Sequence, residues 1–239
     1  MTCVAPPLPA GRRREVVRQG LSVGLATGLY GVSFGALSVA AGVGFWSTIA
    51  LSALMFTGGS QFAFVGVVAA GGGPFAAVAT STLLGVRNAV YGMQVARWLH
   101  VRGPRRVVAA HLTIDESFAV GSAQAEPVAR RIGFWVTGVT VFAGWNLMTA
   151  VGALAGDRLG DPRRYGLDAM AAAAFLALLW PRLTAREPRV VAVFAAAVAL
   201  VCVPVLPAGL PVLAAGVVAL ASAVLQRRRE RPTTGEARP

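Results

Sequence analysis

Residues 20–42 read GLSVGLATGLYGVSFGALSVAAG and contain no charged side chain. A helix needs about 20 mostly apolar residues, at a rise of about 1.5 Å per residue, to cross the hydrocarbon core of a bilayer. This run is long enough and apolar enough, so it predicts a membrane-spanning helix.

The composition of the whole chain excludes a water-soluble globule. Hydrophobic residues make up 56% of the 239 residues and charged residues 13%, against about 25% charged in an ordinary soluble domain. Mean hydropathy is +0.64. Two Cys and two His are too few for a zinc cluster or a disulfide framework, so we expect neither a metal nor a cofactor.

Six further apolar runs predict helices of the same kind. A weaker segment, 107–125, contains His111, Asp115 and Glu116 and is too polar to insert without a partner. We therefore predict an all-α, polytopic membrane helix bundle with about seven hydrophobic helices, one or two of them interrupted near the midplane. The six runs are 47–70, 75–98, 132–156, 165–181, 190–206 and 209–226.

The charges indicate how the bundle is oriented. All 22 basic residues are Arg, against 10 acidic residues, and they stand between the apolar runs, as in cytoplasmic loops. They form no stripe with interleaved aromatics, so a nucleic-acid partner is not expected. Arg clusters flank both ends, which predicts a multi-pass inner-membrane protein in contact with lipid. Its predicted parts are a cytoplasmic basic tail at 1–19, a single transmembrane domain at 20–226 and a cytoplasmic tail at 227–239.

Two ends on the cytoplasmic side require an even number of crossings, which seven full spans do not provide. Either 107–125 also crosses, making eight, or 47–70 folds back as a re-entrant hairpin, leaving six. The hairpin arrangement keeps the Arg residues at 97–106 inside. Both arrangements remain open from the sequence.

Small residues recur every three or four positions through the first run, and so share one helix face. Such faces let helix backbones approach closely in lipid. The face is either a packing seam or part of a substrate path. Its members are Gly20, Gly24, Gly28, Gly31, Gly35, Ser38 and Gly42.

The middle of the second run contains Gly58 and Gly59, followed by Ser60 and Gln61. Each glycine weakens a helix by about 1 kcal/mol relative to Ala. Interrupted helices at the midplane expose backbone amide and carbonyl groups to solutes in many transporters. The segment is therefore either a kink or a true break that binds a solute.

Arg87 falls in the middle of the third run, on one helix face with Tyr91 and Gln94. An ionised residue at this depth faces the bundle interior and needs a carboxylate or carbonyl partner. Arg87 is either a structural ion pair or a site for a solute carboxylate, which its planar fork suits. Thr113 and Glu116 fit a capping box that starts a helix near 114. Because the box already uses the Glu116 side chain, Asp115 is the preferred partner of Arg87.

These observations define a candidate site and its alternatives. Asp168 starts another run, where an acid also stabilises the first turn of a helix. No Ser/His/Asp spacing, Walker loop or H-E-x-x-H motif appears, so we do not expect an enzyme. We predict solute contacts from Gly58, Gly59, Ser60, Gln61, Arg87, Asn88 and Tyr91, with Asp115, Glu116 and Asp168 as coupling or ion-pair candidates.

Five motifs in order over residues 15–225 resemble the AzlC-type permeases, the large subunit of branched-chain amino acid exporters. The motifs are GVSFGAL at 31–37, FTGGSQF at 56–62, VRN at 86–88 with Tyr91, DESF at 115–118, and GLD at 166–168 followed by FLALL at 175–179. The resemblance implies export of leucine, isoleucine, valine and methionine, with a small AzlD-type membrane subunit. Asn88 departs from the family, which usually has a titratable His there.

The sequence thus predicts a secondary transporter that exports branched-chain amino acids, coupled to the proton gradient. The solute comes from the resemblance, and the polar-cored membrane bundle comes from composition and periodicity. The alternatives are a membrane-embedded enzyme and an accessory subunit of another membrane complex. The missing catalytic motifs argue against the first, and Arg87 with the Gly-Gly interruption argues against the second.

Overall fold

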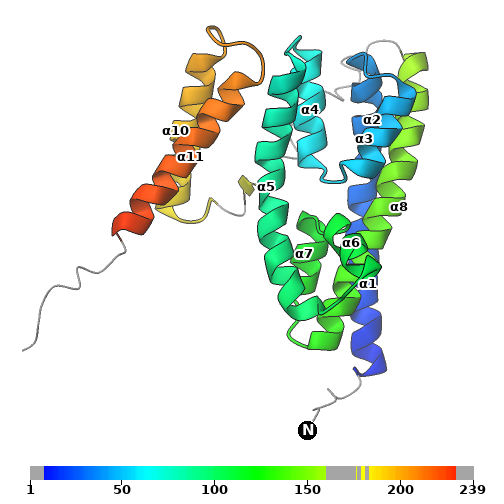
Figure 1. The fold of residues 1–239 in the computed structure, drawn as a ribbon. Coiled ribbons are helices and arrows are strands. Elements are labelled where there is room, and N and C mark those ends of the chain that lie inside the picture. The colour runs from blue at the N-terminus through cyan, green and yellow to red at the C-terminus, as the bar shows by residue number, and fades with distance from the viewer. Residues whose placement is uncertain (1–7, 160–175, 177–178, 181–182, 230–239) are drawn as a thin grey trace, which may run out of the picture.

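The computed structural model describes residues 8–159, 176, 179–180 and 183–229, and the described part contains helices and no strand (Figure 1). Helix α1 spans Ala10–Leu29 and α2 spans Gly31–Ala40. Helix α1 therefore begins ten residues before the predicted start at 20, because the segment from Arg12 to Arg18 is also helical. The second half of the predicted basic tail is helical as a result.

Helices α1 and α2 run beside α8, Pro127–Leu159, along most of its length (Figure 1). Two stretches, Ala10–Ala40 and Pro127–Gly156, are long and apolar enough to cross a membrane. The prediction was about seven such helices. Run 47–70 divides into two shorter helices, and 165–181 lies almost wholly outside the described residues. Runs 75–98, 190–206 and 209–226 form helices, but these are not among the two long apolar stretches.

The second run folds as a hairpin of two half-length helices, α3 at Phe45–Leu54 and α4 at Gly59–Ala69. Each is about 15 Å long at 1.5 Å per residue, half the hydrocarbon thickness of a bilayer. We call this pair the first hairpin. It occupies the upper half of the molecule in Figure 1, with its turn at mid-height. Of the two predicted arrangements, the structure has the one in which 47–70 folds back.

Helix α5, Pro74–Leu99, leads from the first hairpin to a second one. The second hairpin consists of α6, Pro104–His111, and α7, Asp115–Ser122, and lies in the lower half of Figure 1. The predicted alternative, in which 107–125 crosses the membrane, is therefore wrong. The segment contains two helices of 8 residues each, and both are too short to span.

The remaining described helices are α10, Arg186–Cys202, and α11, Leu210–Arg229. They pack on each other, and α11 also contacts α5. Thr80 of α5 takes part in this contact, since its Oγ1 donates a hydrogen bond to the carbonyl of Gly209.

The small-residue face of α1 and α2 is a packing seam against α8. A Cβ on Gly28 would lie 3.1 Å from Cα of Gly144, and one on Gly31 would lie 2.5 Å from the carbonyl oxygen of Trp145. Gly42 lies outside the seam, with φ +84° and no atom near its Cβ position. Because internal contacts occupy this face, it is free neither for a substrate path nor for a partner subunit.

Candidate functional site

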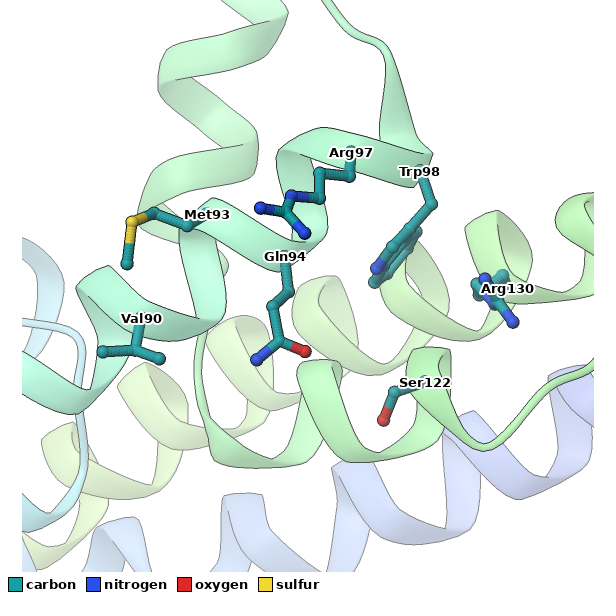
Figure 2. Close-up of a pocket in the computed structure, with 7 residues that line it drawn as sticks. All are labelled: Val90, Met93, Gln94, Arg97, Trp98, Ser122 and Arg130. Atoms are coloured by element: carbon teal, nitrogen blue, oxygen red, sulfur yellow. The ribbon is translucent and has the colours of Figure 1, made fainter. Parts of the chain in front are cut away.

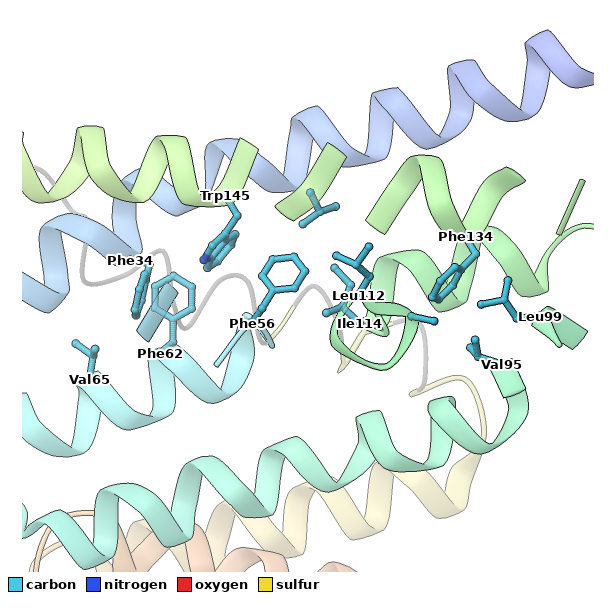
Figure 3. Close-up of a cluster of buried hydrophobic side chains, with 12 residues drawn as sticks. Phe34, Phe56, Phe62, Val65, Val95, Leu99, Leu112, Ile114, Phe134 and Trp145 are labelled. Carbon is cyan, nitrogen blue, oxygen red and sulfur yellow. The ribbon is translucent and has the colours of Figure 1, made fainter. Parts of the chain in front are cut away.

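The turns of the two hairpins meet in the middle of the molecule. The ring of Phe56, in the first turn, is 5.8 Å from the ring of His111, the last residue of α6. Both rings also pack on Phe142 of α8, at 5.0 and 5.5 Å. Figure 3 shows Phe56 beside Leu112 and Ile114 of the second turn, within the buried core. The fold therefore brings residues from three elements to one level.

The first turn is a true break in the helix. Gly58 has φ 60° and ψ −85°, and α4 begins at Gly59. Gln61 closes the hairpin, since its Nε2 donates a hydrogen bond of 2.9 Å to the carbonyl of Leu51. Part of the predicted binding residue Gln61 thus has a structural role, while its buried Oε1 has no hydrogen-bond partner.

Arg87 and Asp115 lie together at this level. Arg87 is in the middle of α5 and Asp115 is the first residue of α7. Their Nη2 and Oδ2 atoms are 2.6 Å apart, and the two side chains are 29% and 14% exposed. The positive end of the α7 dipole also favours a carboxylate at Asp115. Within the described part of the chain, Arg87 pairs with Asp115 and not with the neighbouring, half-buried Glu116.

The start of α7 is capped differently from the prediction. Ser117 Oγ accepts a hydrogen bond from the amide of Ile114 and donates to the carbonyl of Leu112. Thr113 Oγ1 instead donates to the carbonyl of Ala109 at the end of α6. The predicted capping box of Thr113 and Glu116 is therefore wrong, because Thr113 faces the preceding helix and Ser117 takes the capping position.

Several buried polar atoms in the first turn, at the start of α4 and in the middle of α5 have no hydrogen-bond partner in the described structure. A buried polar group without a partner is costly, so such a cluster is expected where a polar ligand binds. Ser60 of α4 lies against α5, since its Oγ is 3.5 Å from the position that a Cβ on Gly85 would take. The atoms are Thr57 Oγ1, Ser60 Oγ, Gln61 Oε1, Arg87 Nε and Asn88 Oδ1.

An aromatic stack lies next to the ion pair, one helical turn further along both helices. The rings of Tyr91 and Phe118 are 4.4 Å apart and inclined by 9°. Tyr91 is buried and belongs to the helix of Arg87, whereas Phe118 belongs to the helix of Asp115. The stack therefore holds α5 and α7 together beside the charged pair.

Sequence reasoning missed the aromatic rings that pack beside this site, those of His111, Phe118 and Phe142. His111 was visible as a polar residue in a weak segment, but no local pattern indicates that its ring meets Phe56. Asp168 lies outside the described residues. Among the residues that the structure describes, no cluster of His, Cys, Asp or Glu forms a metal site.

The model of the AzlC protein family matches residues 22–159, more than half of the chain. The chain belongs to the AzlC family. The match is shorter than the resemblance over 15–225 and ends with α8, so it covers both hairpins and α5. AzlC proteins are a transporter family linked to branched-chain amino acids, and in general they work with a partner subunit. Neither a curated protein nor a solved structure gives a match.

Proposed function

We propose that this AzlC protein exports branched-chain amino acids across the inner membrane, and that the Arg87–Asp115 pair binds the solute and couples its export to protons. The observation that carries the proposal is the 2.6 Å ion pair where the two hairpins meet. A guanidinium in a bilayer interior is unfavourable by a few kcal/mol. Its presence there is explained if it alternates between Asp115 and the carboxylate of a solute.

The geometry of Arg87 supports such an exchange. The contact with Asp115 is an ion pair without hydrogen-bond geometry at Nη2, and Nε has no partner either. A guanidinium offers a fork of donors that matches a carboxylate in two parallel hydrogen bonds. Arg87 therefore has unused donors for a second carboxylate.

The remaining groups of an amino acid also have complementary neighbours. Asn88 Oδ1 and Thr57 Oγ1 are buried acceptors without partners, and an ammonium group supplies up to three donors. Phe56 and Phe142 provide apolar surface at the same level, which suits an aliphatic side chain. A zwitterion with a branched aliphatic side chain satisfies all three features.

Asp115 is the proposed proton acceptor. Protonation would remove its charge, release Arg87 to the solute carboxylate, and so link an incoming proton to an outgoing amino acid. Asn88 cannot take this role, because an amide does not titrate. We also propose a small AzlD-type membrane subunit as the partner. Only the family supports this partner, because the small-residue face of α1 and α2 already packs on α8.

Efflux of preloaded labelled leucine, isoleucine and valine from cells that express the chain with its partner subunit tests the proposal. Arg87→Ala should abolish efflux. Arg87→Lys should retain the ion pair but lose most of the efflux, because an ammonium forms no bidentate fork. Arg102→Lys, at an exposed position between α5 and α6, is the matched control and should transport normally. Normal efflux by Arg87→Lys would overturn the carboxylate-binding role.

The pH dependence of efflux tests the coupling separately. Asp115→Asn should leave a residual efflux that no longer varies with external pH, whereas Glu116→Gln should keep the wild-type profile. If Asp115→Asn exports with the wild-type profile, Asp115 is a structural partner of Arg87 and not a proton carrier.

A further inference from the structure

A cavity of about 480 Å³ lies between the last two turns of α5, the end of α7 and the start of α8 (Figure 2). It is separate from the hairpin junction, and the proposed transport mechanism does not use it. We call it the basic cavity. Its lining consists of Val90, Met93, Gln94, Arg97, Trp98, Ser122 and Arg130.

The basic cavity lies at the end of the molecule that carries the N-terminal Arg residues. Arg12 bonds to the Gln124 side chain and contacts Glu126, both between α7 and α8. Arg130 is on the first turns of α8, and its Nε donates to the Gln124 carbonyl. Because positively charged loops face the cytoplasm, the basic cavity is at the level of the cytoplasmic lipid headgroups.

The charged end of the basic cavity needs an anion. Arg97 and Arg130 both line it, and none of the seven lining residues is acidic. Glu126, the acid closest to Arg130 in the chain, is held by Arg12 at 3.4 Å. Arg130 uses its Nε for the backbone, which leaves its two terminal nitrogens for a ligand. Arg–phosphate pairs of this kind are often bidentate.

The other end of the basic cavity is apolar and open. Val90 and Met93 are 44% and 63% exposed, and they share one face of α5 with Arg97. Val90 lies about 10 Å along the helix axis from Arg97, at 1.5 Å per residue. Exposed apolar side chains of a membrane-embedded helix contact hydrocarbon. The basic cavity therefore joins a cationic end to a lipid-facing end.

We propose that the basic cavity binds the headgroup of an anionic phospholipid of the cytoplasmic leaflet, with an acyl chain along Val90 and Met93. A phosphodiester such as that of phosphatidylglycerol brings a net negative charge and needs no acid from the protein. An amino acid is a poorer fit, because its ammonium would find no carboxylate among the lining residues. Trp98 suits the same depth, since Trp is enriched at membrane interfaces. The inference does not depend on the direction or solute of transport.

Native mass spectrometry of the full chain in mixed micelles tests this assignment. The wild-type protein should retain phosphatidylglycerol in preference to phosphatidylcholine. Arg97→Gln with Arg130→Gln should weaken phosphatidylglycerol binding about tenfold or more, since each basic residue near a membrane surface contributes about 1 kcal/mol. Arg105→Gln with Arg106→Gln removes the same charge from exposed positions of α6, and should leave the preference unchanged.

Additional variants and a competition experiment distinguish loss of charge from loss of folding, and lipid binding from amino-acid binding. Arg97→Gln alone should show an intermediate loss and leave the fold intact, because Arg97 is exposed. Arg97→Lys with Arg130→Lys should restore part of the binding. Equal retention of both lipids by the wild type, or an equal loss in the α6 control, would overturn the proposal. Displacement of phosphatidylglycerol by free leucine would also overturn it, and would identify the basic cavity as a solute entry site.

Discussion

Gly58 makes the break in the first hairpin possible. Its φ of 60° with ψ −85° is a backbone conformation that side chains with a Cβ rarely adopt. The adjacent Gly59 starts α4 and does not need that freedom. One residue thus ends the run of helix, turns the chain and frees the polar atoms of Thr57 and Ser60.

Gly58→Ala should lower the free energy of unfolding by about 1–3 kcal/mol, the usual cost of a residue held in a strained backbone conformation. Gly66→Ala is the matched control in the same hairpin, because Gly66 is helical and no atom lies within 4 Å of its Cβ position. The control should be neutral or slightly stabilising. Thermal unfolding in detergent measures both, and equal melting temperatures would contradict the assigned role of Gly58.

The contact between Arg12 and Glu126 joins the start of α1 to the loop before α8. The pKa of Glu126 is lowered, first by a hydrogen bond from its own backbone amide and then by the Arg12 side chain. A lowered pKa in the folded state means that the ionised Glu126 side chain, through both interactions, stabilises the fold above the ordinary carboxyl pKa. The contribution is lost as the pH falls through the folded-state pKa.

Glu126→Gln should therefore reduce the drop in melting temperature between pH 7 and about pH 3.5, the range in which a glutamate protonates. The effect should be small, because both partners are substantially exposed and solvent screens such pairs. Glu187→Gln, at an exposed acid in the first turn of α10, should keep the wild-type drop. Identical pH profiles for all three proteins would contradict the contribution of this contact.

At the scale of elements, the long α1–α2 pair packs on α8 through glycine. A Cβ on Gly35 would collide with the backbone carbonyl of Thr149, and a Cβ on Gly152 would collide with that of Val32. Backbone atoms cannot move aside as the ends of flexible side chains do. The backbones of α2 and α8 therefore lie so close together that only glycine fits at these two positions.

Gly35→Ala should destabilise the protein by about 1–3 kcal/mol or more, the cost of overpacking a close interface. Gly11→Ala should not, since nothing lies within 4 Å of its Cβ position near the start of α1. Thermal unfolding in detergent again compares the pair. A Gly35→Ala protein as stable as the Gly11→Ala protein would show that the α2–α8 seam is looser than described.

At the scale of the molecule, the two hairpins enter from opposite ends and meet at their turns (Figure 1). This arrangement has short helices on each side of the site, and the charged pair beside their turns is partly buried. Both ends of the first hairpin lie at one end of the molecule, so we expect them on the same side of the membrane.

Labelling with a membrane-impermeant thiol reagent in cells tests the topology in a background without Cys3 and Cys202. Ser47→Cys and Gly73→Cys, both exposed and at the two ends of the first hairpin, should label from outside. Ala123→Cys, exposed after α7, should label only after the cells are opened. Labelling of Ser47→Cys and Gly73→Cys from opposite sides would show that 47–70 crosses the membrane fully.

Much of the site was predictable because its signals are local. A midplane arginine, a polar segment that carries acids and a Gly-Gly pair in an apolar run each stand out against hydrophobic surroundings. Arg87 and Asp115 were expected to pair because a buried charge needs an opposite one, and the structure brings them together. The contacts of His111, Phe118 and Phe142 were not predictable, since each depends on which aromatic ring of a distant element packs beside it.

The helical class, the family and the need of Arg87 for an acid all follow from the amino-acid pattern, because composition, periodicity and desolvation act on short segments. Three features became visible only in the folded chain: 47–70 folds back, 107–125 divides into α6 and α7, and Ser117 caps α7. The folded chain also has α8 packed on the glycine face. These outcomes depend on the packing of segments far apart in the chain, where a few ångströms between backbones select one of several locally acceptable arrangements.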